Sequence, residues 1–427
     1  MFYTKGGLID KKGENRMQDF NKTMIINRAE KKLTEIFSEL ELIRDINQEK
    51  VLRAFQDNRV GEEHFYTVSG YGHDDLGRDI IDRVYAQVFN CEAAVVRNHF
   101  VSGTHAIACG FFGNLRHGDK LVAVAGRPYD SLEEVIGIRG GGKSSLIAHG
   151  VEYEEVPLVN DTNVNLEKLE ETIDETTTMA FIQRSRGYSL RKPLTIEDIA
   201  EIISTIKRKN PECICFVDNC YGEFTEALEP TDVGADLIAG SLIKNPGGGI
   251  VETGGYVAGR KKYVELAAER LTAPGIGRKG GAMLNQSRLI LQGFFMAPSI
   301  VHEALKGAIL ASQVFIDSGF KTSPLPDEVR TDIIQAVIFG DREKLLRFCK
   351  AVQKNSPVDS CITPVPDGVP GYEDELIMAA GTFIEGSTIE LSADGPLREP
   401  YVAYMQGGLN YAHIKIALKG ILNEVSA

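Results

Sequence analysis

The segment Cys213-Ile-Cys-Phe-Val-Asp218 is a short apolar run that ends in one carboxylate. Its length and its lack of polar alternation are typical of a strand that is buried on both faces. Similar runs occur at residues 120–125, 178–183 and 236–240, and amphipathic segments such as 195–207 lie between them. This alternation predicts an α/β fold with a mainly parallel sheet that helices cover on both faces.

The pattern of apolar and polar residues is different on both sides of this region. Residues 25–57 show apolar side chains at three- and four-residue steps, which predicts two helical stretches. A long helical stretch begins near Gly293, and the sequence beyond it indicates a smaller α+β unit that the N-terminal helices complete. We expect an N-terminal helical segment at 1–60, a large domain at 61–300 and a small C-terminal domain at 301–427.

Composition excludes several classes of protein. The 427 residues are 43% hydrophobic, which is enough apolar surface for one or two cores, so neither a disulfide-stapled miniprotein nor a disordered chain is expected. The net charge of −13 disfavours nucleic acid as a partner, because a phosphate backbone attracts cationic surfaces. The apolar stretches are interrupted well before the roughly 18 residues that a membrane span needs.

The cysteines and histidines carry no metal signature. The seven cysteines lack CxxC spacing, and the eight histidines lack HxH or HxxxH spacing, so we expect no metal site. Residues 1–27 mix both charge signs without an apolar core, so no signal peptide is expected there. Together these features predict a reduced, cytoplasmic protein.

One motif points to a nucleotide. The string Gly137-Ile-Arg-Gly-Gly-Gly-Lys-Ser144 fits the P-loop pattern, in which Lys143 would contact a phosphate. A P-loop needs a strand that leads into it and a long helix that follows it. The segment before this string is instead helical in pattern, and only about six residues separate Lys143 from the next expected strand. A mobile glycine-rich loop is therefore the preferred interpretation, and a P-loop NTPase is the least favoured function.

A second set of residues points to different chemistry. Ser102-Gly-Thr104 follows an apolar strand and opens a helix, a position that either caps the helix or offers free N–H groups to an anion. Asp218 ends a buried strand, and Lys244 follows another, where desolvation is expected to lower the pKa of an amine. An anion cradle, a buried acid and a buried lysine are the three parts that a pyridoxal phosphate site needs.

Four longer strings then become recognisable as a family pattern. Gly-Tyr-Gly-His-Asp-Asp-Leu-Gly-Arg (70–78), Phe-Val-Ser-Gly-Thr-His-Ala (100–106), Gly-Ser-Leu-Ile-Lys-Asn-Pro-Gly-Gly-Gly (240–249) and Glu-Leu-Ser-Ala-Asp-Gly-Pro-Leu-Arg (390–398) closely resemble the aluminium resistance protein family. This family is a methionine γ-lyase-like branch of the fold-type I pyridoxal phosphate enzymes and is related to cystathionine lyases. The resemblance extends from about residue 30 to the end. It implies a seven-stranded, mainly parallel sheet in a large domain and a smaller α+β C-terminal domain.

The resemblance also assigns roles to residues. Lys244 matches the Schiff-base lysine, and Asp218 matches the partner of the pyridinium nitrogen. Tyr129 matches the aromatic residue that stacks on the cofactor ring, and it is a candidate general acid. The residues that match the phosphate-binding positions are Ser102, Gly103, Thr104 and Ser241.

Three further residues match positions at the edge of the site. Tyr71 and Arg78 lie where the lyases use a tyrosine and an arginine to reach the cofactor phosphate of the neighbouring subunit. Tyr71 is also a candidate for substrate binding and for protonation of the leaving group. Arg398 resembles the arginine that receives the substrate carboxylate, and the alternative is a surface ion pair.

The resemblance therefore implies a pyridoxal phosphate-dependent carbon–sulfur lyase that cleaves a small sulfur-containing amino acid by β- or γ-elimination. It also implies a homodimer or homotetramer with active sites at the subunit interface. Two alternatives use the same Lys244 and Asp218. One is another reaction of the same cofactor, such as aldol cleavage or transamination, and the other is a non-catalytic pyridoxal phosphate-binding stress protein.

Overall fold

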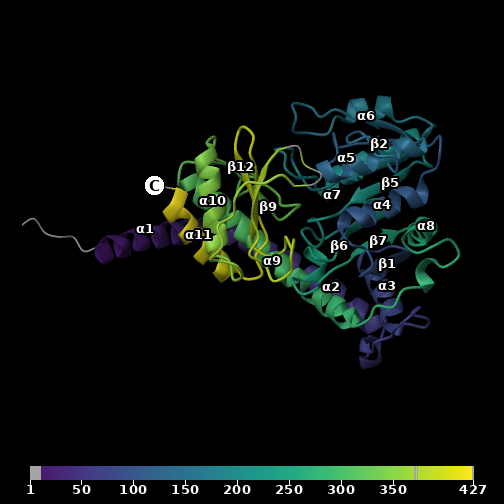
Figure 1. Cartoon of the computed structure of the whole chain (residues 1–427), viewed down its shortest axis with the longest axis horizontal. Coiled ribbons are helices and arrows are strands. Elements are labelled where there is room, and N and C mark those ends of the chain that lie inside the picture. The colour runs from purple at the N-terminus through teal and green to yellow at the C-terminus, as the bar shows by residue number, and fades with distance from the viewer. Residues whose placement is uncertain (1–10, 370–371, 373, 426–427) are drawn as a thin grey trace, which may run out of the picture.

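Two sheets, one in each of two adjoining domains, organise the chain (Figure 1). The computed structural model describes the backbone of residues 11–369, 372 and 374–425, and the side chains from residue 21 onward. The larger sheet has the strand order β1-β7-β6-β5-β4-β2-β3, and only β7 runs antiparallel to the rest. Its strands are β1 (Ala93–Arg97), β2 (Lys120–Ala123), β3 (Glu152–Glu155), β4 (Thr177–Gln183), β5 (Ile214–Asp218), β6 (Leu237–Ser241) and β7 (Gly255–Gly259). The predicted seven-stranded, mainly parallel sheet is confirmed.

Side chains that alternate along the central strands supply two separate cores. In β5, Phe216 packs with Phe111 and Phe181 on one face, whereas Val217 joins the core on the other face. Because both faces are covered, the strand is apolar throughout, as its sequence predicted. One face carries α4 (Gly103–Asn114), α5 (Asp130–Ile136) and α8 (Lys261–Leu271), and the other carries α3 (Leu76–Val88), α6 (Leu166–Thr172), α7 (Ile196–Lys209) and α9 (Gln286–Asp317).

The smaller sheet is antiparallel and lies in the C-terminal domain. Its order is β10-β11-β12-β9-β8, formed by β8 (Lys321–Ser323), β9 (Ile334–Ile338), β10 (Leu376–Ala379), β11 (Ser392–Pro396) and β12 (Val402–Gln406). The helices of this domain are α10 (Arg342–Lys354) and α11 (Tyr411–Val425). One face of the sheet packs on Tyr188 and Tyr221 of the large domain, so the two domains meet at the carboxyl ends of the large sheet's strands.

The N-terminal helices pack on elements of both domains. Helix α1 (Lys11–Lys32) lies against α9 and α11, with ion pairs Lys32–Asp317 and Glu30–Lys415 at 2.7 Å, and α2 (Thr34–Asp57) packs on α9 and α3. An N-terminal helix thus packs on α11 of the C-terminal domain. The expected boundary at residue 300 lies inside the continuous helix α9, and the three domain boundaries stay predictions.

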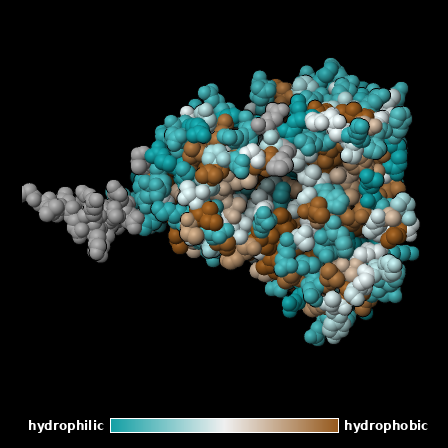
Figure 2. Space-filling model, viewed as in Figure 1, coloured by the Kyte–Doolittle hydropathy of each residue, from teal (hydrophilic) through white to brown (hydrophobic). Residues whose placement is uncertain are grey.

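Helix α9 corrects one sequence-based expectation. In the described part of the chain, it is the single helix long and apolar enough to cross a membrane, although no apolar stretch was expected to reach that length. Its most apolar window is 67% buried within the protein, because α9 joins the two domains and packs on elements of both. On the face drawn in Figure 2, hydrophilic residues are interspersed with hydrophobic ones.

The glycine-rich string around Lys143 does not form a P-loop. Helix α5 leads into it and ends at Gly137, whose φ of 101° is left-handed. Lys143 is exposed, and a short 3-10 turn rather than a long helix follows it. Since neither the preceding strand nor the following helix is present, the backbone N–H groups are not gathered toward a phosphate, and the NTPase hypothesis is wrong.

Candidate active site

The candidate site lies where β4, β5 and β6 end at one edge of the large sheet. Gln183 and Asp218 are cross-strand neighbours at the ends of β4 and β5, and Ser241 ends β6. Parallel strands present their carboxyl ends at the same edge, so polar residues that are far apart in sequence converge there. Helix α4 begins at this edge with Ser102 as its N-cap, whose hydroxyl accepts a hydrogen bond from the His105 N–H at 3.1 Å.

The first turn of α4 has the form of an anion cradle. Gly103 lies so close to β6 that an added Cβ would stand 3.2 Å from both Cys220 Sγ and Ser241 Cβ. The Thr104 hydroxyl is 3.2 Å from the Tyr129 hydroxyl and 3.1 Å from Ser131 Oγ. The free amides of a helix N-terminus together with the Ser102 and Ser241 hydroxyls suit a phosphate group.

Asp218 is the buried acid of the site and is only 4% exposed. Its carboxylate accepts a hydrogen bond from the Cys220 N–H at 3.1 Å. Burial raises the pKa of Asp218, while nearby Lys244 opposes the rise by favouring the charged form. A buried carboxylate with one backbone donor and a nearby cation can pair with a protonated ring nitrogen.

Lys244 follows β6 and extends over the ring of Tyr221, with Nζ 3.9 Å from the ring centroid. Tyr221 has a left-handed backbone with φ of 70°, and Asn245 Nδ2 donates to the Tyr221 carbonyl at 3.0 Å. Burial lowers the pKa of Lys244, but Cys220, Tyr221 and Asp218 outweigh burial and raise it well above the ordinary lysine value. The predicted lowering of this pKa is therefore wrong, because acidic groups surround the amine.

The turn after Lys244 packs backbone to backbone on α9. A Cβ on Gly248 would lie 2.5 Å from the Gly293 carbonyl oxygen, and one on Gly293 would lie 2.3 Å from the Gly247 carbonyl oxygen. Side chains at these positions would force the turn away from the helix. The glycine run thus serves close packing that holds the lysine turn in place.

Replacement of Gly247 is expected to damage both stability and the site. A Cβ there would lie 1.8 Å from the Leu242 carbonyl oxygen, so Gly247→Ala must move backbone and is expected to cost at least about 2 kcal/mol. Thermal unfolding and cofactor affinity measure the two effects. Gly142→Ala is the matched control, because an added Cβ at Gly142 meets no atom within 4 Å. Equal melting temperatures for the two variants would contradict the packing argument.

A cavity of about 520 Å³ opens above Lys244, between the two domains. Tyr129, Asp218 and Lys244 line it from the large domain. Arg398 lines it from the C-terminal domain, but its guanidinium bonds Asp374 at 2.9 Å and the Tyr188 carbonyl at 3.0 Å. The other lining residues include Arg127, Gln183, Arg186, Tyr188, Arg191, Cys220, Tyr221, Tyr372 and Gln406.

Tyr71 and Arg78 lie outside this cavity. Tyr71 is 83% exposed on the loop before α3. Arg78 is 3% exposed, and its guanidinium bonds the Gly72 carbonyl at 2.6 Å and the Asp79 carboxylate at 3.0 Å. Arg78 therefore supports its own loop within this chain, and its contact with the cofactor phosphate of a neighbouring subunit stays a prediction.

Sequence reasoning missed the aromatic and acidic residues that follow Asp218. Cys220 lies beside Gly103 and its thiol hydrogen-bonds to Asp218, and Tyr221 contacts Lys244. Glu223 is fully buried and accepts a hydrogen bond from the Tyr256 hydroxyl at 2.8 Å, while its Oε2 has no partner among the described residues. The sequence signal that could have identified these residues is their position directly after a strand that ends in an acidic residue.

Glu223 is expected to make stability depend on pH. Burial raises the pKa of Glu223 to about 8. At pH values between the lower pKa of the unfolded state and about 8, the folded protein therefore keeps a proton on Glu223 that the unfolded chain releases. The free energy of unfolding therefore falls as pH rises, by on the order of 2 kcal/mol between pH 6 and pH 8. Glu223→Gln is expected to remove this fall. Urea unfolding at both pH values tests it, and the same pH slope in wild type and variant would contradict it.

Comparison with known proteins gives one family. A family model described as methionine gamma-lyase matches residues 22–426. The structure of a carbon-sulfur lyase involved in aluminum resistance from Clostridium novyi NT is 48% identical, covers 98% of this chain and 100% of that chain, and has a TM-score of 0.92. The uncharacterized protein YnbB of Bacillus subtilis is 48% identical over 391 residues, which is 91% of this chain and 93% of YnbB.

A more distant neighbour shares the fold alone. The pyridoxal-5'-phosphate-dependent protein YhfS from Escherichia coli is 16% identical, covers 90% of this chain and 97% of that chain, and has a TM-score of 0.61. The predicted fold, that of the fold-type I pyridoxal phosphate enzymes, is confirmed.

Proposed function

The chain belongs to the methionine gamma-lyase family, and on that premise we propose that it is a pyridoxal phosphate-dependent carbon–sulfur lyase. Its substrate is a small sulfur-containing amino acid, cleaved by β- or γ-elimination. The observation that carries the proposal is the convergence of Lys244, Asp218 and the Gly103 turn on one interdomain cavity. The carbon-sulfur lyase that is 48% identical over nearly the whole chain supports the same chemistry.

The residues present fit the cofactor at each of its polar groups. The phosphate would be held by the amides of Gly103 and Thr104 and by the hydroxyls of Ser102 and Ser241 at the N-terminus of α4. Asp218 would pair with the ring nitrogen, and Tyr129 would stack on the ring. When bound, the cofactor would draw electrons from the Cα of a substrate held in the site and so make the Cα proton acidic.

Different side chains of the site would then carry out the different proton transfers. The Lys244 amine would be the base that removes the Cα proton. Tyr129 would donate a proton to the departing sulfur, since its hydroxyl is protonated at neutral pH and burial raises its pKa further. The Thr104 hydroxyl, 3.2 Å away, orients that phenol. Asp218 would face the ring nitrogen, and the nearby Lys244 favours the charged form of its carboxyl group.

Product analysis tests this function. Purified protein loaded with pyridoxal phosphate is incubated with methionine, cystathionine and S-methylcysteine, and thiol, ammonia and 2-oxo acid are measured. Lyase activity yields all three in equal amounts, with pyruvate from β-elimination and 2-oxobutyrate from γ-elimination. Amino acid formation from an added 2-oxo acid, or aldehyde release from a β-hydroxy amino acid, would instead favour transamination or aldol cleavage. Cofactor binding without turnover would favour a non-catalytic protein.

We also propose that a second copy of the chain completes the site. Tyr71 is largely exposed, and Val101, beside the Ser102 cap, is exposed as well, so an uncovered surface adjoins the cradle. A mixed dimer of Lys244→Ala and Tyr71→Phe chains would then regain one intact site and part of the activity. Activity equal to the sum of the separate variants would contradict shared sites. Seven free thiols support our proposal of a cytoplasmic location.

A further inference from the structure

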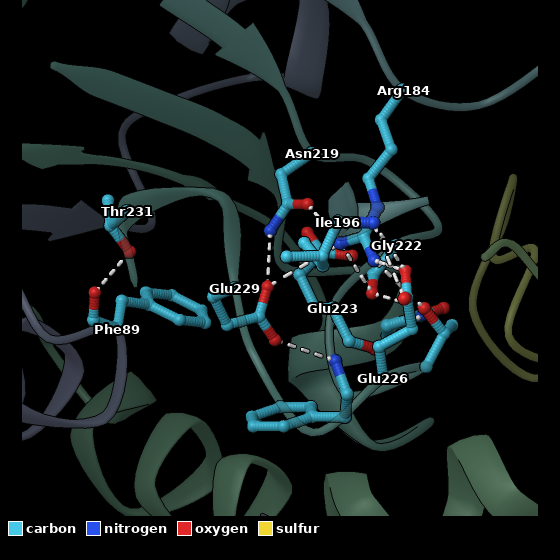
Figure 3. A network of polar contacts seen from close by, with 12 residues as sticks. Phe89, Arg184, Ile196, Asn219, Gly222, Glu223, Glu226, Glu229 and Thr231 are labelled. Atoms are coloured by element: carbon cyan, nitrogen blue, oxygen red, sulfur yellow. Dashed lines mark hydrogen bonds and ion pairs between the residues drawn. The ribbon is translucent and has the colours of Figure 1, made fainter. Parts of the chain in front are cut away.

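The turn at residues 221–226, directly after Cys220, belongs to no helix or strand, and side chains from three other parts of the chain hold its backbone. Figure 3 shows one of these contacts, in which the Arg184 guanidinium donates to the Gly222 carbonyl at 2.9 Å. Two buried asparagines make further contacts, and each of them donates to two carbonyls of the turn. The shape of the turn therefore depends largely on side chains and not on a ladder of backbone hydrogen bonds.

Asn245 holds the half of the turn that carries Tyr221. Its Nδ2 donates to the Tyr221 and Glu223 carbonyls, both at 3.0 Å. The side chain is fully buried, and its Oδ1 has no partner among the described residues. Because the donor end of the amide faces two carbonyl oxygens, a side chain without N–H or O–H groups cannot replace it. The Tyr221 half of the turn thus depends on this amide.

Asn47 of α2 makes the matching contact at the other half of the turn. Its Nδ2 donates to the Phe224 carbonyl at 3.3 Å and to the Glu226 carbonyl at 2.9 Å. It is as deeply buried as Asn245, and its Oδ1 is likewise unpaired in the described part of the protein. The two asparagines are therefore alike in burial and in bonding, and they differ in which half of the turn they hold.

Tyr221 keeps a backbone conformation that an aromatic residue rarely adopts. Its φ of 70° is left-handed, which crowds Cβ against the backbone. Such a conformation persists only where the surrounding contacts enforce it. It accompanies a ring centroid 3.9 Å from Lys244 Nζ, and Asn245 bonds the carbonyl of the same tyrosine. Loss of that bond would leave Tyr221 free to take an ordinary conformation and to withdraw its ring from the amine.

We propose that Asn245 is a positioning residue for the Lys244 amine and that it acts through Tyr221. This role rests on the proposed function, in which the amine is the base at the substrate Cα. A lysine side chain has several rotatable bonds, and an aromatic ring against Nζ restricts them. A base that is in place before the reaction avoids a loss of freedom that would otherwise slow it. Asn245 keeps the ring in place, and the ring keeps the amine in place.

Steady-state kinetics of Asn245→Ala and Asn47→Ala, both loaded with pyridoxal phosphate, test this role. Each variant loses one buried amide that bridges two carbonyls, so a similar fall in melting temperature is expected. Asn245→Ala is expected to lower kcat by about 10²-fold and to change KM by less than about threefold. Asn47→Ala is expected to keep kcat within about threefold of wild type. Equal losses of kcat in the two variants would overturn the proposal, because they would indicate a structural role alone.

A double-mutant cycle tests whether Asn245 acts through Tyr221. Tyr221→Asn removes the ring, and asparagine tolerates the left-handed conformation. In the Tyr221→Asn protein, Asn245→Ala is expected to lower kcat by less than about threefold, because the ring that it positions is already absent. Losses that multiply in the double variant would overturn the proposed route. Asn245→Ser, which removes less of the side chain, takes the place of Asn245→Ala in both experiments if that protein does not fold.

Crystal structures of the cofactor-free full chain separate this proposal from the proposed function, because they require no turnover. In wild type and Asn47→Ala, the Tyr221 ring centroid is expected to stay within about 6 Å of Lys244 Nζ. In Asn245→Ala, the ring is expected to leave this range. An unmoved ring in Asn245→Ala would overturn the positioning role. Wild type that binds the cofactor but cleaves no sulfur-containing amino acid would instead contradict the lyase function, and the position of the ring would still decide the role of Asn245.

Discussion

Lys244→Ala is expected to abolish carbon–sulfur cleavage and the visible absorbance of the cofactor bound to the lysine. In the described part of the cavity, Lys244 provides the single lysine amine, so its loss removes both the covalent attachment and the base. General-base catalysis alone contributes about 10²–10⁴-fold, and loss of the attachment adds to this. We therefore expect kcat to fall by at least about 10⁴-fold. Thiol release and the absorbance spectrum of the loaded protein measure the two losses.

Lys143→Ala is the control for this experiment. Lys143 is exposed in the glycine-rich string and lies outside the cavity, so its loss is expected to leave spectrum and turnover unchanged. Methylamine added to the Lys244→Ala protein replaces the missing amine and is expected to restore part of the proton abstraction. An unchanged absorbance spectrum in the Lys244→Ala protein would remove the basis of the proposed function.

The positions of Asp218 and Lys244 were predictable because each depends on local sequence. An apolar run of strand length that stops at a charged residue marks the end of a buried strand, and parallel strands end at one edge. The start of α4 was predictable for the same reason, since Ser102 caps the helix through a contact only three residues away. Local pattern, together with the rule that parallel strands end at one edge of a sheet, was sufficient to predict that the cradle, the acid and the amine lie together.

The environment of the amine could not be predicted, because it depends on contacts between distant segments. Tyr221 lies under Lys244 only because its backbone is left-handed and Asn245 holds its carbonyl, and neither feature has a sequence signature. Arg78 also donates to the Gly281 carbonyl, 203 residues away, and no local pattern indicates that contact.

Asp218→Asn is expected to leave the cofactor bound but to lower turnover by about 10²–10⁴-fold. The amide fills the same space and can still accept the hydrogen bond from the Cys220 N–H, so the local packing at the end of β5 is kept. It carries no negative charge, however, and cannot stabilise a protonated ring nitrogen in a site that excludes water. The loss therefore appears in kcat, while the phosphate cradle at Gly103 and the amine of Lys244 still hold the cofactor.

Single-turnover rates and exchange of the Cα proton with solvent distinguish this role from a structural one. If Asp218 only supported the fold, its replacement would lower both the melting temperature and the cofactor affinity. Loss of a charge that acts on the ring would instead slow proton exchange at Cα, while the melting temperature and the cofactor affinity would stay nearly unchanged. Asp198→Asn, which neutralises an exposed carboxylate at the start of α7, is the matched control and is expected to retain full activity. If Asp218→Asn exchanged the Cα proton at the wild-type rate, the buried carboxylate would have no electronic role. The end of β5 would then contribute packing alone.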